Sequence, residues 1–183
     1  MSERRRSPAP ALKSLTADER GRLLNELLLA HSEWIDDAEY RARSHLAVVD
    51  ADTVAASFQR TLREADADQL ALRAGRFRGG YVEVGEAASA ILEELLQSEL
   101  DDLARRAKLG LGDAAIQIGL GLLRGLAECR NTVIDGTVLA YAGEDVTDEL
   151  AWSVCNALAK AKLTLPGDAF DSLPSDWSRS LNP

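Results

Sequence analysis

The stretch from Asp113 to Ala127, DAAIQIGLGLLRGLA, is apolar on nearly every side and is interrupted only by Gln117 and Arg124. A helix needs about 20 apolar residues to span a bilayer, so this stretch is too short to do so. A helix that is apolar all round is normally buried by other helices. The stretch therefore predicts the centre of a layered all-α domain. We expect its leucines and isoleucine to be buried and one of two glycines to touch a neighbouring helix: Ile116, Leu120, Leu123 and Leu126, with Gly121 or Gly125.

Length and charge set the next limits. The chain has 183 residues, with 30 acidic against 21 basic residues and a formal net charge of −9. A chain of this size buries about 70% of its unfolded surface and needs no disulfide or metal to fold. Because phosphate backbones attract Lys and Arg, the negative balance disfavours non-specific nucleic-acid binding by the folded body. No segment is long enough to predict a membrane span.

The chain divides by composition into three parts. Residues 1–13 carry Arg4, Arg5 and Arg6 with two prolines and no following apolar run, which predicts a disordered basic arm and excludes a secretory signal. Residues 14–165 read as a helical domain. Residues 166–183 read as a tail that docks on this domain or on a partner.

Helix signals recur along residues 14–165. Thr16 and Glu19 have the spacing of a capping box, and Asp50 or Asp52 is suited to cap a later helix. A long amphipathic run covers residues 84–108, and the last helix is expected over about 147–163. Helix starts fall about 29–34 residues apart, which is typical of helical hairpins. The predicted fold is an all-α helical-hairpin array with spacing like tetratricopeptide or HEAT repeats, or an irregular multi-helix bundle.

Two segments interrupt the helical pattern. A short helix over about 67–74 is expected to end at Gly75, and Gly79-Gly80 predicts a turn that breaks regular structure. In residues 131–143, Asp135-Gly136 lies between β-branched runs. That segment fits a β-hairpin or a helix–helix loop, and the sequence does not choose between them.

The residues that usually carry chemistry are scarce. His31 and His45 lack a nearby ligand pattern, so no metal site is expected. Cys129 and Cys155 form no C-x-x-C pair and read as reduced, buried thiols of a cytoplasmic protein. The glycines of the central helix have the wrong spacing for a dinucleotide fingerprint and no preceding strand. We predict no catalytic residues and no cofactor.

The strongest local signal for binding is the segment RAGRFRGGY. It interleaves arginines with aromatic residues on a glycine-rich turn: Arg73, Arg76, Phe77, Arg78 and Tyr81. Such a turn could hold phosphate, stack a base or clamp an acidic partner peptide. The structural alternative is a helix C-terminus with favourable cations, followed by aromatic side chains that plug the core.

The tail keeps large apolar side chains, namely Phe170, Leu173, Trp177 and Leu181. Exposing them would favour aggregation, so we expect them to be covered. The spacing predicts an extended turn through Phe170 and a short helix carrying Trp177. These residues would pack on the helical body or insert into a partner.

Residues 78–135 resemble a known class of helical module. The resemblance rests on the turn RGGYVEVGEAA, the acidic leucine-rich helix, Gly110, and the alanine-rich helix that leads to Asp135-Gly136. These features are similar to helical modules that accompany SWIM-type zinc-finger proteins in bacteria. The resemblance implies an accessory interaction module without catalytic residues. It carries over no zinc site, because the chain lacks a cysteine and histidine cluster.

Two functional hypotheses follow. The first is a non-enzymatic helical adaptor of the bacterial cytosol that binds a protein partner. The second is a nucleic-acid accessory factor that uses the Arg4–Arg6 arm and the Arg73–Arg78 turn. The sequence also leaves room for an enzyme with a pocket between helices, for which it names no residues.

Overall fold

The computed structural model describes residues 10–130, 135–175 and 177, and these form an all-α protein with one small β-hairpin. The predicted all-α class is confirmed. The chain splits into two compact units, Met1–His45 and Leu46–Pro183. No helix in the described residues is long and apolar enough to cross a membrane.

The first unit consists of short helices. They are α1 (Pro10–Ser14), α2 (Ala17–Ala30), the 3-10 helix η1 (Ser32–Trp34) and α3 (Ile35–Ala47), which continues two residues into the second unit. The capping box at the start of α2 is present: the Thr16 hydroxyl accepts from the Glu19 amide at 3.3 Å, and the Thr16 amide donates to Glu19 Oε2 at 2.8 Å. These bonds at Thr16 lower the pKa of Glu19.

The start of the first unit differs from the predicted arm. Residues 1–9, which include Arg4, Arg5 and Arg6, lie outside the described residues, but Pro10 opens α1. Proline suits the first turn of a helix, because the amide it lacks has no partner there. Helix therefore begins within the segment 1–13.

The second unit contains four long helices and several short elements. In chain order they are α4 (Ala51–Glu64), η2 (Ala67–Leu72), β1 (Gly75–Phe77), β2 (Gly80–Val82), α5 (Val84–Lys108), α6 (Gly112–Arg130), η3 (Val138–Tyr141), α7 (Val146–Lys160) and η4 (Gly167–Ser172). Asp50 caps α4, as predicted: its side chain accepts from the Thr53 amide at 2.9 Å. The bond that the Thr53 hydroxyl also donates to Asp50, followed by this amide bond, lowers the pKa of Asp50.

Helix α6 is the centre of this unit, as predicted from its composition. Leu120, Leu123 and Leu126 are buried, whereas Ile116 is only half-buried and corrects that part of the prediction. A Cβ on Gly121 would lie 2.6 Å from the Ala51 carbonyl oxygen of α4. Arg124, the charged residue that interrupts the apolar stretch, reaches the surface. There its Nη1 pairs with Asp52 Oδ1 of α4 at 2.6 Å.

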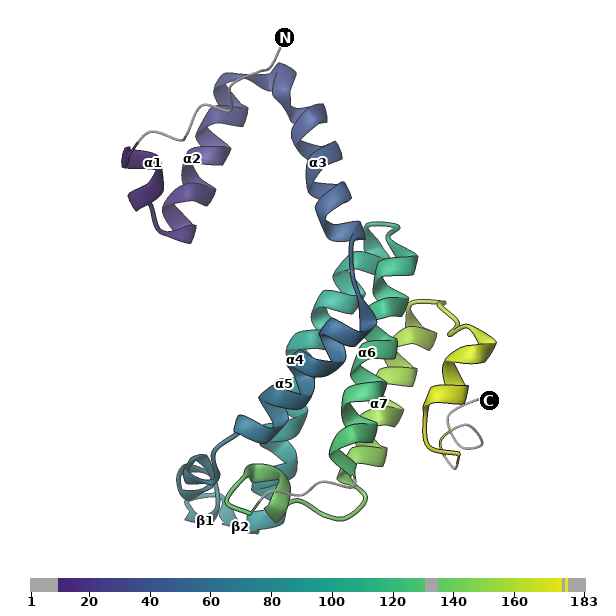
Figure 1. The fold of residues 1–183 in the computed structure, drawn as a ribbon. Coiled ribbons are helices and arrows are strands. Elements are labelled where there is room, and N and C mark those ends of the chain that lie inside the picture. Colours follow the sequence, from purple (N-terminus) through teal and green to yellow (C-terminus); the bar gives the residue numbers. More distant parts are fainter. Residues whose placement is uncertain (1–9, 131–134, 176, 178–183) are drawn as a thin grey trace. The chain divides into compact units, whose positions relative to one another are not determined.

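The contacts of two α6 glycines show how α6 is oriented relative to α4. Gly121 lies against Ala51 and Gly125 against Ala55, so α4 and α6 run parallel. Helices α5 and α6 form an antiparallel pair joined at Gly110, and α7 runs antiparallel to α6 on another side (Figure 1). Helices α5 and α7 are therefore parallel neighbours. The parallel contact of α6 with α4, a helix that is not its neighbour in the chain, is that of an irregular bundle.

The irregular segments correct one expectation and decide between the two alternatives left open by the sequence. The segment around Gly79-Gly80 does not simply break regular structure. It forms an antiparallel hairpin with Gly75 paired to Val82 and Phe77 paired to Gly80. Residues 131–134 lie outside the described residues. The described part of 131–143 is a turn followed by η3, with a single bridge between Asp66 and Thr137, and it follows the loop alternative.

The tail folds onto its own unit in the structure. Leu173 and Trp177 are buried and Phe170 is half-buried, while Leu181 lies outside the described residues. Phe170 lies in the 3-10 helix η4 and not in the expected extended turn. Pro166, which cannot extend the chain of helical hydrogen bonds from α7, precedes η4 directly.

Candidate functional site: a lysine-rimmed groove between α5 and α7

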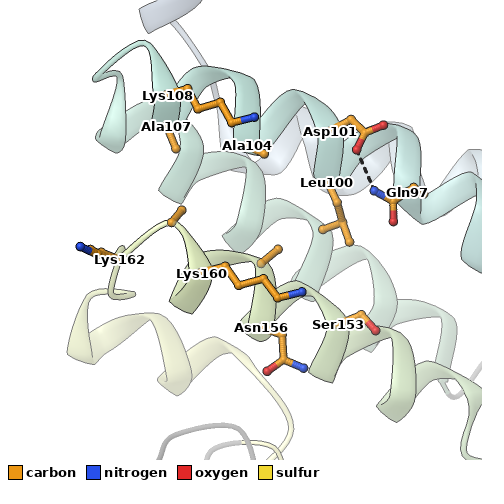
Figure 2. A pocket seen from close by; sticks show the side chains of 12 residues that line it. Gln97, Leu100, Asp101, Ala104, Ala107, Lys108, Ser153, Asn156, Lys160 and Lys162 are labelled. Atoms are coloured by element: carbon orange, nitrogen blue, oxygen red, sulfur yellow. Dashed lines mark hydrogen bonds between the residues drawn. The ribbon is translucent and has the colours of Figure 1, made fainter.

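A groove with a volume of about 660 Å³ runs between the parallel helices α5 and α7 (Figure 2). The residues that line it recur at intervals of three or four along each helix, so each helix contributes one face to the groove. From α5 come Gln97, Leu100, Asp101, Ala104, Ala107 and Lys108, and from α7 and its C-terminus come Ser153, Asn156, Ala157, Lys160, Ala161 and Lys162. We call this surface the lysine groove.

The floor of the lysine groove is built from small side chains. Ala104 and Ala107 on one side and Ala157 and Ala161 on the other are half-buried. The distance between two packed helices depends on the side chains at their contact, and small side chains allow the closest approach. The floor can therefore receive the backbone of another helix, with Leu100 as the one large apolar side chain along it.

Cations gather at one end of the groove. Figure 2 shows Lys108 and Lys162 at that end and Lys160 on the adjoining rim, while Gln97 and Asp101 lie at the other end. The chain has only four lysines, against 17 arginines, and three of the four line this groove. Among the described residues, the carboxylate ion pairs use arginine or histidine, and none uses these lysines.

Lys162 occupies a backbone conformation that side chains disfavour. Its φ angle is +57°, and it is the position after the C-cap of α7, where glycine is most common. The Lys162 amide bonds to the Ala159 carbonyl at 2.9 Å and the Leu163 amide to the Leu158 carbonyl at 3.0 Å, which is the Schellman pattern. A left-handed conformation costs roughly 1–2 kcal/mol for a non-glycine residue. The chain thus places a lysine at this end of the groove at a cost in stability.

The opposite end of the groove is neutral to acidic and is internally bonded. Gln97 Nε2 donates to Asp101 Oδ1 at 2.7 Å. Next to it on α5, Asp102 turns away to the two following arginines, and Arg106 Nε donates to Asp102 Oδ2 at 2.9 Å. Burial raises the pKa of Asp102, but the bonds from Arg106 and Arg105 together outweigh it and hold that pKa below its ordinary value. The groove is therefore electrostatically polar along its length.

An exposed tryptophan lies beside the groove on α7. Trp152 is 59% exposed although it is the largest side chain of the helix. It precedes Asn156 by four residues and Lys160 by eight, so it shares their side of α7. Tryptophan is among the residues most enriched at the energetic centres of protein interfaces.

The predicted arginine turn forms the hairpin of β1 and β2, which we call the arginine hairpin (residues 73–82). Arg73 Nη1 pairs with Glu94 Oε1 of α5 at 2.7 Å, so this arginine is held against the bundle. Arg76 and Tyr81 are direct cross-strand partners, and both are exposed. Arg78 is exposed in the turn, and the Phe77 side chain lies outside the described part of the structure.

The remaining reactive residues are dispersed. His31 stacks on Trp34 with ring centroids 4.2 Å apart, and His45 lies near the end of α3. Burial raises the pKa of both the Cys129 and the Cys155 thiols, which disfavours the nucleophilic thiolate. Within the described ranges, no three His, Cys, Asp or Glu side chains group as a metal site.

The sequence offered one overlooked signal for the lysine groove. Lys108, Lys160 and Lys162 read separately as cations that complement helix C-termini. Only the parallel arrangement of α5 and α7 brings these two C-termini together. The scarcity of lysine elsewhere in the chain is evident from the sequence. Comparison of the chain with protein families, with curated proteins and with solved structures finds no match.

Proposed function

We propose that this protein is a non-enzymatic helical interaction module that binds an amphipathic helix of a protein partner in the lysine groove. The observation that carries the proposal is the combination of a small-residue floor with lysines at one end only. Helix-in-groove binding is a common mode of peptide recognition, in which an apolar helix face fills an apolar groove. The expected accessory role of residues 78–135 agrees with this function.

The charges of the groove specify the partner helix and its direction. Lys108, Lys160 and Lys162 favour acidic residues, and the C-termini of α5 and α7 at this end add partial negative charge. A helix bound antiparallel to both would bring its positive N-terminal pole to that end. Its acidic side chains then belong in its first turn, where they also favour its own dipole. The proposed occupant is therefore an amphipathic helix with an acidic N-terminal turn.

The length of the occupant follows from the lining. The groove extends along α5 from Gln97 to Lys108. At a rise of about 1.5 Å per residue, a partner helix of about 12 residues covers that face. Trp152 beside the groove then offers a large apolar surface to the rim of the same partner, which favours a protein over a small anion.

The test uses a synthetic peptide as the probe. A fluorescein-labelled amphipathic helix with leucines every three or four residues and glutamates in its first turn is titrated with the full chain. Fluorescence anisotropy should show saturable binding, and the double variant Lys108→Glu/Lys160→Glu should bind about tenfold more weakly or worse. Lys13→Glu, which changes the only lysine outside the groove, is the matched control and should bind as the unaltered chain does.

A second peptide makes the experiment decisive. In it the glutamates are moved to the last turn, so that composition and net charge stay the same. We expect this peptide to bind more weakly: in the antiparallel direction its acidic end meets Asp101, and in the reverse direction its negative C-terminal pole meets the C-termini of α5 and α7. Equal binding of both peptides, or equal binding by the lysine variant and the control, would contradict the proposal.

The arginine hairpin supports the second candidate function, contact with nucleic acid. Arg76 and Tyr81 face the same side of the hairpin, which pairs a cation with a ring on which a base can stack. A mobility-shift titration with single-stranded DNA at about 50 mM salt tests this function where phosphate contacts are strong. A shift that the double variant Arg76→Ala/Tyr81→Ala abolishes would support it, and no shift would dismiss it.

A further inference from the structure

The helices of the first unit have no core of their own. Of residues 10–45, none is buried, and α2 and α3 have only 14 and 13 residues. Isolated helices of fewer than about 12–15 residues are marginal in water, and most helices in proteins depend on packing of an apolar face. A segment of about 40 residues also rarely folds without a partner or a staple. These helices therefore need a surface to pack against.

The helices carry apolar faces suited to such packing. On α2, the leucines follow helical spacing, and Leu24 and Leu27 are 51% and 39% exposed. On α3, Ile35 is 48% exposed, and Ala38 and Ala42 continue the same face at intervals of three and four residues. Spacing of three and four residues is that of the seam between two helices that pack side by side.

The charges beside the α3 seam identify the partner. On one flank, Asp37 precedes Arg41 by four residues, and the two side chains pair at 2.7 Å. On the other flank, Glu39 precedes Arg43 by four residues, and they pair at 3.4 Å. Each flank thus reads acid then arginine along the helix. A second α3 laid antiparallel about residue 40 presents arginine then acid, and so brings an opposite charge to within about 3 Å, along the helix axis, of each of these four residues.

We propose that α3 pairs antiparallel with α3 of a second copy of this chain, across the seam of Ile35, Ala38 and Ala42. A two-fold interface requires a surface that is complementary to itself, and the charge order of α3 meets that requirement. Exposed ion pairs within one helix are weak, so they rearrange readily into a shared network of four carboxylate–arginine contacts. The surface is separate from the lysine groove, so either proposal can fail without the other.

A charge-exchange experiment on the full chain tests the pairing. One variant, Asp37→Arg/Glu39→Arg, makes the α3 flanks basic, and the other, Arg41→Glu/Arg43→Glu, makes them acidic. Sedimentation velocity should show a dimer for the unaltered chain, monomers for each variant alone, and a dimer for their equimolar mixture. Only a contact between α3 helices of opposite charge restores association on mixing.

Two controls keep the outcome interpretable. Circular dichroism and urea unfolding should show that Leu46–Pro183 remains folded in both variants, since neither alters that unit. Lys160→Glu, which changes the lysine groove, should stay dimeric. A monomeric unaltered chain up to submillimolar concentration would overturn the proposal. Variants that dimerise alone, or a mixture that stays monomeric, would overturn it equally.

Discussion

The indole Nε1 of Trp177 donates a hydrogen bond of 2.8 Å to Asp148 Oδ1, and this bond joins the C-terminal tail to the first turn of α7. Arg130 at the end of α6 completes the cluster: its Nη2 lies 3.4 Å from Asp148 Oδ2 and its guanidinium lies 5.7 Å from the centre of the indole ring. Trp177 is 2% exposed. A buried indole that also satisfies its N–H makes this residue the anchor of the tail.

Removing the anchor should destabilise the second unit. Trp177→Ala deletes a buried aromatic side chain, which typically costs about 3–5 kcal/mol. Asp148→Ala leaves the indole N–H without its acceptor and should cost about 1–3 kcal/mol. Urea unfolding followed by circular dichroism gives both values. An unchanged midpoint for Trp177→Ala would mean that the tail does not pack on this unit in solution.

The contact between α4 and α6 should not tolerate a side chain at Gly121. A Cβ there would lie 2.6 Å from the Ala51 carbonyl oxygen and from Val54 Cβ, so Gly121→Ala must move α4. We expect a loss of about 1–3 kcal/mol from overpacking. Gly85→Ala in α5 is the helical control, because its Cβ would meet its nearest neighbour at an ordinary 3.5 Å. Thermal unfolding should separate the two, and equal melting temperatures would refute the close approach.

Lys162 should show opposite effects on stability and binding. Lys162→Gly relieves the positive φ angle of +57° and should stabilise the fold by about 0.5–1 kcal/mol. The same change removes one of the three groove lysines and should weaken binding of the acidic peptide. Urea unfolding and fluorescence anisotropy on one preparation measure both. A variant that is more stable and binds as well as the unaltered chain would remove Lys162 from the site.

Acid should lower the free energy of unfolding through protonation of Asp102, which lies in the C-terminal half of α5. Burial raises its pKa, but the bonds from Arg106 and Arg105 prevail, so the folded-state pKa lies below the ordinary value of 3.8. The stabilising contribution is therefore complete well above pH 3.8 and is lost as the pH falls through the lowered pKa. Asp102→Asn should flatten the acid limb of a plot of unfolding free energy against pH. An unchanged acid limb would show that this carboxylate contributes nothing.

Local signals in the sequence predicted the elements of this fold well. The capping box of Thr16 and Glu19, the cap at Asp50 and the bounds of α5 all depend on neighbours within a few residues, and the structure contains each of them. The burial of Leu120, Leu123 and Leu126 followed from an apolar surface too wide to be left in water. In each case the signal that predicted the feature lies within one helix and its cap.

The parts that escaped prediction depend on contacts between distant segments. Arg73 was named as a candidate binding residue of the arginine turn, and its ion pair with Glu94, which lies 21 residues away, gave no sign in the local pattern. The lysine groove requires α5 and α7 to be parallel. They are parallel because α6 lies between them in the chain and runs antiparallel to both. Ile116 was placed in the core by its hydrophobicity, but it lies at the edge of the buried face of α6.

The most direct test of the groove is an NMR titration that observes its floor. Alanine methyl groups of the full chain are labelled, and the peptide with glutamates in its first turn is added. Shifts should concentrate at Ala104, Ala107, Ala157 and Ala161, while buried alanines of α6 such as Ala115 stay nearly unchanged. Shifts spread evenly over the molecule, or none at the four groove alanines at saturating peptide, would contradict helix binding between α5 and α7.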